Sequence, residues 1–344
     1  MTNPILVEVT RGPLVESYHR GAVIVVGVTG APRLSIGDTV RPVFPRSAIK
    51  LIQTLPLIET GAAERFGFGD EEIALACGSH AGGDRHVAIA RRMMAALDLD
   101  EHCLACGPAE PQGTKARREL AAHGGRPTAF HHNCSGKHAG MLAATRASNA
   151  RIGTYTAAAH PVQRHIHAAL SDLTGTPLQA DVCGVDGCCV PTWAMPLETL
   201  ARLFAKIGTG EGIPPDRRAA FARILSAAWN QPDLIAGPGR ADTVVMTALP
   251  RRIFMKTGAE GIYCGALPEL GLGFALKIDD GATRAGAAAV MPLIERLIPQ
   301  ARGLVHRSIL KTPLGQDAGT IRTSRDYEQA LNSLAPSFTG RGLG

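Results

Sequence analysis

The segment "HHNCSGKHAG" at residues 131–140 brings three histidines, one cysteine and one lysine together with small residues. Such side chains bind ligands or metals more readily than they fill an apolar core. A phosphate loop of the form G-x-x-x-x-G-K-[ST] is excluded, because its first glycine is missing and no hydroxyl follows Lys137. Metal binding is compatible with the segment, since Cys134 and His138 are four residues apart and would share a helix face.

A second cysteine-rich segment, "DVCGVDGCCV" at residues 181–190, contributes Cys183, Asp186, Cys188 and Cys189. Two thiolates from separate loops with one nitrogen donor would suit Zn²⁺. The chain has no matched pair of C-x-x-C motifs, and "CLAC" at Cys103–Cys106 is equally compatible with cysteines packed at a helix end. From the residues alone, zinc binding and buried structural thiols both remain open.

Ser47 and Lys50 are three residues apart at the predicted start of a helix that follows Pro45. A partly desolvated lysine can take the proton of a neighbouring serine, and the N–H groups of a helix start can bind an oxyanion. The S-x-x-K motif is short and occurs by chance in many proteins, so this motif alone favours a surface lysine on an amphipathic helix.

Lys256-Thr257-Gly258 lies in a predicted strand near the other end of the chain. An S-x-x-K motif followed by a C-terminal K-T-G is the order found in penicillin-binding proteins and serine β-lactamases. The S-D-N element of those proteins is absent, but "ACGSHAGG" supplies Ser79 in a glycine-rich loop. Ser79 is therefore either a proton relay or a turn serine.

The segments around these motifs predict an α+β fold. "ILVEVTRG" and "LVESYHRGAVIVVGV" predict a hairpin split at Gly12-Pro13, and helical periodicity then prevails to about residue 235. Strand-like segments return in "DTVVMTAL", "RIFMKTG", "GIYCGALPE" and "LGFALKIDDG", before a closing helix in "TRAGAAAVMPLIERLI" and a polar, loosely held end. We expect one catalytic unit, residues 1–344. An antiparallel sheet from residues 1–45 and 236–344 would carry a mainly helical part, residues 46–235.

Charge and hydropathy limit the classes of partner that the chain could bind. The formal net charge is +6, but the arginines are scattered among acidic residues without a long basic run, which favours a small-molecule partner over nucleic acid. The N-terminus carries Glu8 and Glu16 where a signal peptide needs an apolar stretch, and no apolar run reaches the length of a membrane helix. We therefore expect a cytoplasmic protein with no membrane partner, and eight cysteines that are thiols or metal ligands.

The combination of "RSAIKLIQ", "ACGSHAGG", "HHNCSGKHAGML", "DVCGVDGCCVP" and "KTGAEGIYCG" resembles the serine-dependent L-asparaginase II family of the rhizobial type. The resemblance covers roughly residues 5 to 330, and "NCSGKHAGM" and "KTGAEG" are its most specific parts. It implies a fold like that of serine β-lactamases and glutaminases, a homodimer, and hydrolysis of L-asparagine to L-aspartate and ammonia.

The resemblance also implies roles for individual residues. Ser47 with Lys50, and Ser79 with Lys256, would be the catalytic residues. Zn²⁺ would be bound by Cys134, Lys137 and Cys188, so that Lys137 replaces His138 as the nitrogen ligand. A lysine binds a metal only as the neutral amine, so we expect the site to depress its pKa. The remaining candidates, for substrate binding or support of the metal, are His138, Asp186, Gly258 and Ala259.

Two other functions are compatible with parts of this pattern. A penicillin-recognising esterase or β-lactamase would share the S-x-x-K and K-T-G motifs but would leave "HHNCSGKHAGM" without a use. A zinc-stabilised binding protein without enzymatic activity would use the cysteine loops only as structure. Hydrolysis of L-asparagine through a serine acyl-enzyme accounts for all the motifs together.

Overall fold

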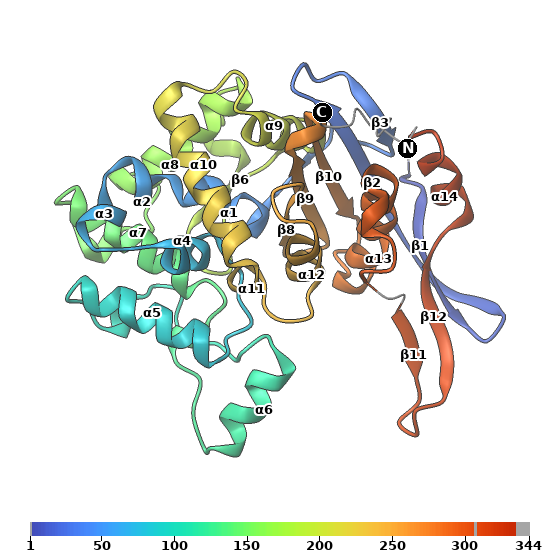
Figure 1. The fold of residues 1–344 in the computed structure, drawn as a ribbon, viewed down its shortest axis with the longest axis horizontal. Coiled ribbons are helices and arrows are strands. Elements are labelled where there is room, and N and C mark those ends of the chain that lie inside the picture. The colour runs from blue at the N-terminus through green and yellow to red at the C-terminus, as the bar shows by residue number, and fades with distance from the viewer. Residues whose placement is uncertain (1, 306–307, 335–344) are drawn as a thin grey trace, which may run out of the picture. The chain divides into compact units, whose positions relative to one another are not determined.

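The computed structural model describes residues 2–305 and 308–334 and divides the chain into two compact units. The sheet unit comprises residues 1–43, 196–209 and 257–344, and the helical unit comprises residues 44–195 and 210–256. As predicted, the fold is α+β, with an antiparallel sheet built from the two ends of the chain (Figure 1). No helix in the described ranges combines the length and the apolar character that a membrane span needs.

An eight-stranded sheet forms the core of the sheet unit. Its strands are β1 (Ile5–Arg11), β2 (Leu14–Gly27), β3 (Pro32–Ile36), β8 (Phe254–Gly258), β9 (Ile262–Leu267), β10 (Leu272–Ile278), β11 (Ser308–Lys311) and β12 (Asp317–Thr323). They follow the order β11-β12-β1-β2-β10-β9-β8, with β3 paired to β2, and the neighbours from β11 to β9 are antiparallel. Residues 22–26 of β2 are buried without alternation, which shows that both faces of the sheet are covered there.

The N-terminal hairpin is confirmed. β1 pairs with β2, and Gly12 adopts φ +54° at the turn between them, a conformation that favours glycine. Helix α9 (Leu197–Thr209), which belongs to the sheet unit, packs on β10. A Cβ at Gly273 of β10 would lie 2.1 Å from the carbonyl oxygen of Ala201, so this close approach requires glycine.

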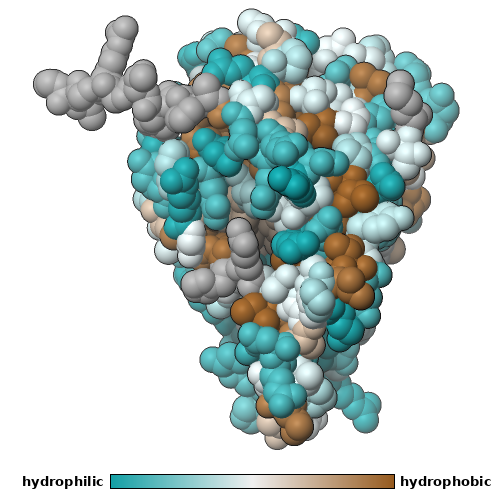
Figure 2. All heavy atoms as spheres, turned by 90° about the vertical axis from the view of Figure 1, so that its right-hand side faces the viewer, coloured by the Kyte–Doolittle hydropathy of each residue, from teal (hydrophilic) through white to brown (hydrophobic). Residues whose placement is uncertain are grey.

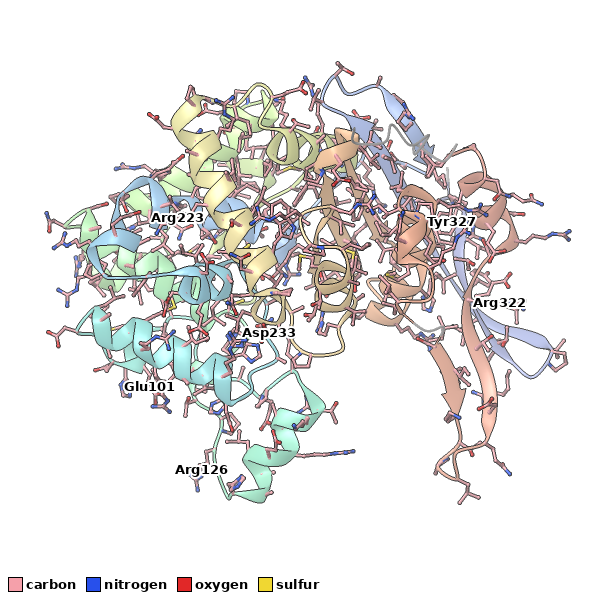
Figure 3. All side chains as sticks on the ribbon, viewed as in Figure 1. Glu101, Arg126, Arg223, Asp233, Arg322 and Tyr327 are labelled. Carbon is pink, nitrogen blue, oxygen red and sulfur yellow. The ribbon has the colours of Figure 1, made fainter. Side chains whose placement is uncertain are left out.

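The closing helix is also confirmed, as α13 (Thr283–Leu297). The prediction of a loosely held end is wrong for residues 308–334, because β12 pairs with β1 and is followed by helix α14 (Arg325–Leu331). The Tyr327 hydroxyl, labelled in Figure 3, is buried and donates to the carbonyl of Ala289 at 3.0 Å, which ties α14 to α13. The remainder of the predicted end, residues 335–344, lies outside the described residues.

In the helical unit, several helices pack around one buried helix, α7. The helices of this unit are α1 (Lys50–Gln53), α2 (Leu55–Glu59), α3 (Ala62–Arg65), α4 (Asp70–Cys77), α5 (Asp84–Ala96), α6 (Thr114–Ala122), α7 (Ser135–Ala147), α8 (Pro161–Thr174), α10 (Pro215–Asn230), α11 (Pro232–Ile235) and α12 (Ala241–Ala248). Every residue of α7 from Ser135 to Thr145 is buried, and α2, α3, α4, α5 and α8 pack around it. A helix enclosed in this way holds its side chains in fixed positions.

One predicted strand is wrong. "DTVVMTAL" forms the helix α12, although Thr243, Val244 and Val245 are β-branched residues typical of strands. Asp242 lies in the first turn, where an acidic residue favours a helix, and Val245 and Met246 are buried. Burial of this helical face outweighs the local strand propensity.

Candidate functional site

Ser47 and Lys50 lie in the helical unit, at the short 3-10 helix η1 (Arg46–Ile49) and the first residue of α1. Ser47 is half-buried, whereas Lys50 is fully buried. Lys50 Nζ donates to the carbonyl oxygen of Gly78 in a short hydrogen bond and to that of Asn133 at 3.3 Å. Among residues 2–305 and 308–334 no side-chain hydrogen bond joins Ser47 to Lys50, although the backbone N–H of Lys50 donates to the carbonyl of Ser47. Lys50 therefore links the segments that carry Ser79 and Cys134.

Ser79 and Lys256, far apart in sequence, lie in hydrogen-bond contact. Lys256 is on β8, in the part of that strand that belongs to the helical unit, and its Nζ donates to Ser79 Oγ at 2.9 Å. Both side chains are buried. Burial lowers the pKa of Lys256 from 10.5 to about 7, the Asp242 carboxylate opposes this shift, and the positive charge of Lys50 adds to it. A lysine of this pKa exchanges a proton with a serine at neutral pH.

Asp242 was not predicted from the sequence as a site residue. It is fully buried in the first turn of α12 and is the strongest charge that favours the ammonium form of Lys256. Cys77, at the end of α4, is buried near the same lysines, and burial raises the pKa of its thiol to about 12. Cys77 is therefore a neutral thiol at physiological pH. No sequence motif marked Asp242, because the surrounding residues predict a strand.

The three candidate zinc ligands are brought together. Cys134 immediately precedes α7, Lys137 lies in its first turn, and Cys188 lies in the turn between the short strands β5 (Cys183–Val185) and β6 (Pro191–Trp193). Lys137 Nζ donates to Cys188 Sγ at 2.8 Å, and all three side chains are buried. The described residues contain no cluster of three His, Cys, Asp or Glu side chains that could hold a metal.

The charges at these residues depend on one another. A hydrogen bond from the Cys188 thiol lowers the pKa of Cys134 well below its usual range, and the same bond raises the pKa of Cys188. Burial lowers the pKa of Lys137, but the sulfur atoms of Cys188 and Cys134 more than offset this and raise it above the usual value. The expected depression of this pKa is therefore absent without a metal. Two buried sulfur ligands and an amine form a donor set that Zn²⁺ accepts, provided that the metal displaces the lysine proton.

His138 is hydrogen-bonded to Tyr155. Its Nδ1 lies 2.6 Å from the Tyr155 hydroxyl, which also accepts a hydrogen bond from the backbone N–H of Ala105 at 2.8 Å. The Nε2 atom is buried and makes no hydrogen bond to the described residues. Lys137, and not His138, contacts Cys188.

Asp186 connects the β5–β6 turn to the residue before Ser47. Arg46 donates to the Asp186 carboxylate at 2.9 Å, and both side chains are mostly buried. Arg46 also adopts φ +51°, a strained backbone conformation for a residue with a side chain. The sequence did not mark Arg46 as a site residue, although it is the direct neighbour of Ser47.

Gly258 and Ala259 follow Lys256 closely along the chain, in the sheet unit. Gly258 ends β8, and Ala259 is exposed in the turn after it. The eight cysteines are all free thiols, including the partly exposed Cys103 and the buried Cys106.

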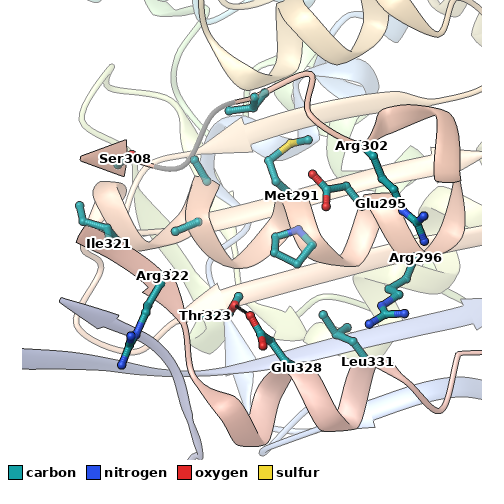
Figure 4. Close-up of a pocket in the computed structure, with 14 residues that line it drawn as sticks. Met291, Glu295, Arg296, Arg302, Ser308, Ile321, Arg322, Thr323, Glu328 and Leu331 are labelled. Carbon is teal, nitrogen blue, oxygen red and sulfur yellow. Dashed lines mark hydrogen bonds between the residues drawn. The ribbon is translucent and has the colours of Figure 1, made fainter. Parts of the chain in front are cut away.

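Two cavities lie apart from the candidate residues. One of about 390 Å³ in the sheet unit is lined by α13, β12 and α14 and carries charges of both signs, among them Glu295, Arg296 and Arg302 (Figure 4). The other, of about 670 Å³ in the helical unit, is lined by residues of α2 and α10. Neither cavity is lined by a predicted catalytic or metal-binding residue. We place the candidate site at two hydrogen bonds, one between Lys256 and Ser79 and one between Lys137 and Cys188.

The comparison with family models agrees with the family resemblance. A family model described as L-asparaginase II matches residues 7–322. Among curated proteins, no sequence match was found. Among solved structures, a β-lactamase from Mycobacterium bovis is similar, with 12% sequence identity and a TM-score of 0.38, over 76% of this chain and 88% of the other.

Proposed function

The chain belongs to the L-asparaginase II family, and we propose that it hydrolyses L-asparagine to L-aspartate and ammonia through a serine acyl-enzyme. The observation that carries this proposal is the buried contact between Lys256 Nζ and Ser79 Oγ, together with the pKa of Lys256 of about 7. A neutral amine beside a serine hydroxyl is the group that serine–lysine amide hydrolysis requires.

We assign the nucleophile to Ser47, because it is half-buried and reachable whereas Ser79 is almost fully buried. Its Oγ attacks the side-chain amide carbon of asparagine while Lys50 takes the hydroxyl proton. The backbone N–H group of Ser47 stabilises the oxyanion that forms. The C–N bond then breaks, and the proton removed from Ser47 is relayed through Lys256 and Ser79 to the departing ammonia, so that Lys256 is a neutral amine before and after the step. Water attacks the β-aspartyl ester, which releases L-aspartate and restores the Ser47 hydroxyl.

Cys134, Lys137 and Cys188 would hold Zn²⁺, which supplies a positive centre that orients the substrate. Arg46, tethered by Asp186, would present a second positive charge next to Ser47. His138, with Nδ1 occupied by Tyr155, would direct its buried Nε2 toward substrate or water instead of the metal. These residues bind and position the substrate, and the serine–lysine residues move the protons.

The test is ammonia release from L-asparagine and L-glutamine by the wild type, Ser47→Ala, Ser79→Ala and the control Ser148→Ala. Ser148 is exposed beyond the last residue of α7. Ser47→Ala should lower kcat by about 10⁴- to 10⁶-fold while zinc stays bound, and Ser148→Ala should match the wild type. Activity that survives Ser47→Ala but not Ser79→Ala would transfer the nucleophile to Ser79.

Two further outcomes would replace the proposal. Hydrolysis of nitrocefin without ammonia release from either amide would indicate a penicillin-recognising hydrolase. Unfolding on chelation without hydrolysis of any of these substrates would indicate a zinc-stabilised binding protein.

We also propose that the enzyme is a homodimer. Figure 2 shows one face of the sheet unit as polar surface with scattered apolar side chains, and exposed apolar residues occur near the ends of two hairpins, among them Leu14 and Leu314. Size-exclusion chromatography with light scattering should give twice the chain mass of 36.1 kDa. Leu314→Asp should weaken a dimer formed through this end of the sheet, whereas Val40→Asp, at an exposed residue outside both hairpins, should not.

A further inference from the structure

His80, the residue after Ser79, forms a fully directed chain of hydrogen bonds. The backbone N–H of Gly82 donates to His80 Nδ1 at 3.2 Å, so Nδ1 must be the acceptor and the ring proton must be on Nε2. Nε2 then donates to Ser135 Oγ at 2.9 Å. The Ser135 hydroxyl in turn donates to the carbonyl of Phe130 at 3.0 Å. Each atom in this chain has one possible role.

The chain joins two segments that carry different parts of the candidate site. The Ser79 loop, residues 78–83, holds the serine that contacts Lys256, and the ligand segment, residues 130–137, holds Cys134 and Lys137. The His80 backbone N–H also donates to the carbonyl of Asn133 at 3.2 Å. His80 thus connects the two segments through both its backbone and its ring.

The ring of His80 is held in place from the side as well. His86 stacks on it, with ring centroids 4.9 Å apart and planes inclined by 11°. His86 Nε2 donates to the carbonyl of Asp233, labelled in Figure 3, at 3.2 Å. Burial lowers the pKa of His80 well below its usual range, which is consistent with a neutral ring that accepts at Nδ1. Rotation or tautomer exchange of His80 would break at least one of these contacts.

We infer that His80 is a positioning residue whose Nε2–H bond to Ser135 sets the spacing between the Ser79 loop and the ligand segment. Metal affinity and the rate of the serine chemistry therefore both depend on one hydrogen bond that touches neither substrate nor metal. This inference rests on the proposed function for the identity of the metal and the reaction. It adds a residue and a coupling between two sites that the family resemblance did not supply.

Two substitutions of His80 test the hydrogen bonds of Nδ1 and Nε2 separately. An asparagine amide reaches about as far as Nδ1 and can accept from Gly82, and a glutamine amide reaches about as far as Nε2 and can donate to Ser135. The full-length, zinc-loaded protein would be prepared as His80→Asn, His80→Gln, Ser135→Ala and the double variant His80→Asn/Ser135→Ala. Zinc affinity would be measured by competition with a chromophoric chelator, and kcat and KM for L-asparagine at saturating zinc.

His160 provides a matched control. It is also buried, its Nδ1 accepts from the backbone N–H of Val162 at 3.2 Å, and its Nε2 donates to the carbonyl of Arg151 at 3.1 Å. This copy of the same local geometry lies at the start of α8, outside both segments. His160→Asn should therefore lower thermal stability to a similar degree as His80→Asn without changing zinc affinity or kcat.

We expect His80→Asn and Ser135→Ala each to weaken zinc binding by about 10- to 100-fold, as loss of a supporting hydrogen bond does at other zinc sites. Each should also lower kcat by about 10-fold at saturating zinc, with KM changed less. His80→Gln should stay within about threefold of the wild type, and the double variant should be no worse than the poorer single variant. If His80→Asn does not fold, Ser135→Ala alone provides the test.

The inference is overturned if both His80→Asn and Ser135→Ala bind zinc as the wild type does, or if His80→Gln is as impaired as His80→Asn. Zinc binding and ammonia release by the wild type show whether the inference alone fails or the proposed function fails as well. A wild type that binds zinc and releases ammonia, with unaffected variants, removes only the role of His80. A wild type that does neither removes the proposed function and this inference with it.

Discussion

Lys256 Nζ lies 2.9 Å from Ser79 Oγ, and both groups are buried within the helical unit. The second lysine of the site, Lys50, instead donates to the backbone carbonyls of Gly78 and Asn133. Two buried lysines close to each other disfavour each other's positive charge, which helps to keep one of them neutral. The two lysines therefore differ in their contacts, since Lys50 bonds to two backbone carbonyls whereas Lys256 bonds to a serine hydroxyl.

The activity should depend on a group with a pKa near 7. Because Lys256 acts as the neutral amine, kcat/KM should fall as pH decreases through about 7, by about tenfold per pH unit. Asp242→Asn removes the carboxylate that favours the ammonium form, so the midpoint of this limb should move to lower pH. A pH–rate profile of both proteins measures this, and an unchanged midpoint in Asp242→Asn would exclude Lys256 as the titrating group.

Lys256→Met should separate catalysis from stability. We expect kcat to fall by about 10²- to 10⁴-fold, whereas the free energy of unfolding at pH 7 should not decrease, because a buried ionisable group is replaced by an apolar one of similar size. The folded-state pKa of about 7 is below the ordinary value of 10.5. The unfolded chain therefore binds more protons between these values, and wild-type stability should gain from rising pH in that window. Urea unfolding at pH 7 and pH 9 should show that the free energy of unfolding increases with pH in the wild type and that this increase is missing in Lys256→Met.

Gly136 and Gly140 form a matched pair on α7. A Cβ at Gly136 would lie 2.5 Å from both Cγ and the carbonyl oxygen of Leu75, whereas a Cβ at Gly140 would lie 3.0 Å from Cβ of Ala76. Gly136→Ala should lower the free energy of unfolding by about 1–3 kcal/mol and weaken zinc binding, because Cys134 and Lys137 flank it. Gly140→Ala should be close to neutral, since the gain in helix propensity of about 1 kcal/mol offsets the tighter contact. Equal zinc affinities in the two variants would contradict the expectation.

Glu59 should stabilise the helical unit without affecting activity. It accepts hydrogen bonds from Arg217 at 2.9 Å and from His165, which join α2 to α10 and α8. Burial alone would raise the pKa of the Glu59 carboxyl, but these two hydrogen bonds outweigh burial. The net pKa is therefore lower than the ordinary value of 4.5. A lowered carboxyl pKa contributes stability that is present above the unfolded pKa and is lost as pH falls through the folded one.

Glu59→Gln should therefore lower the free energy of unfolding by about 1–3 kcal/mol at pH 7 and flatten its decline below pH 4.5. Glu64→Gln, which breaks an exposed pair with Arg223, is the control and should cost about 0.5 kcal/mol or less. Chemical denaturation across pH gives both values. A loss of kcat at neutral pH in Glu59→Gln would indicate that this network reaches the active site.

Removal of the metal should affect binding more than turnover. If Zn²⁺ at Cys134, Lys137 and Cys188 orients the substrate, chelation should raise KM by about 10-fold or more and leave kcat within about threefold. Steady-state ammonia release before and after chelation, with zinc re-addition as the control, measures both constants. An equal loss in kcat would assign the metal to the chemical step.

Much of the architecture follows from local patterns. Alternating apolar residues and the Gly12-Pro13 turn predicted the β1–β2 hairpin, and the apolar residues around Lys256 predicted the strand β8. The prediction failed at residues 241–248, where β-branched residues favoured a strand and burial of a helical face decided for α12. It failed again at residues 308–334, whose polar strand is held by pairing with β1 rather than by a buried apolar run.

The sequence by itself determined the family, the serine and lysine motifs and the candidate ligands, because these depend on residue types at short spacings along the chain. The family resemblance had already paired Ser79 with Lys256 and Lys137 with the two cysteines. Only the tertiary structure decided that Lys50 bonds to two backbone carbonyls and that His80 joins the Ser79 loop to the ligand segment. Asp242 and Arg46 likewise became visible only in space. Residue spacing decides which face of an element a side chain occupies, whereas contacts between distant segments depend on how the buried helix α7 is packed by its neighbours.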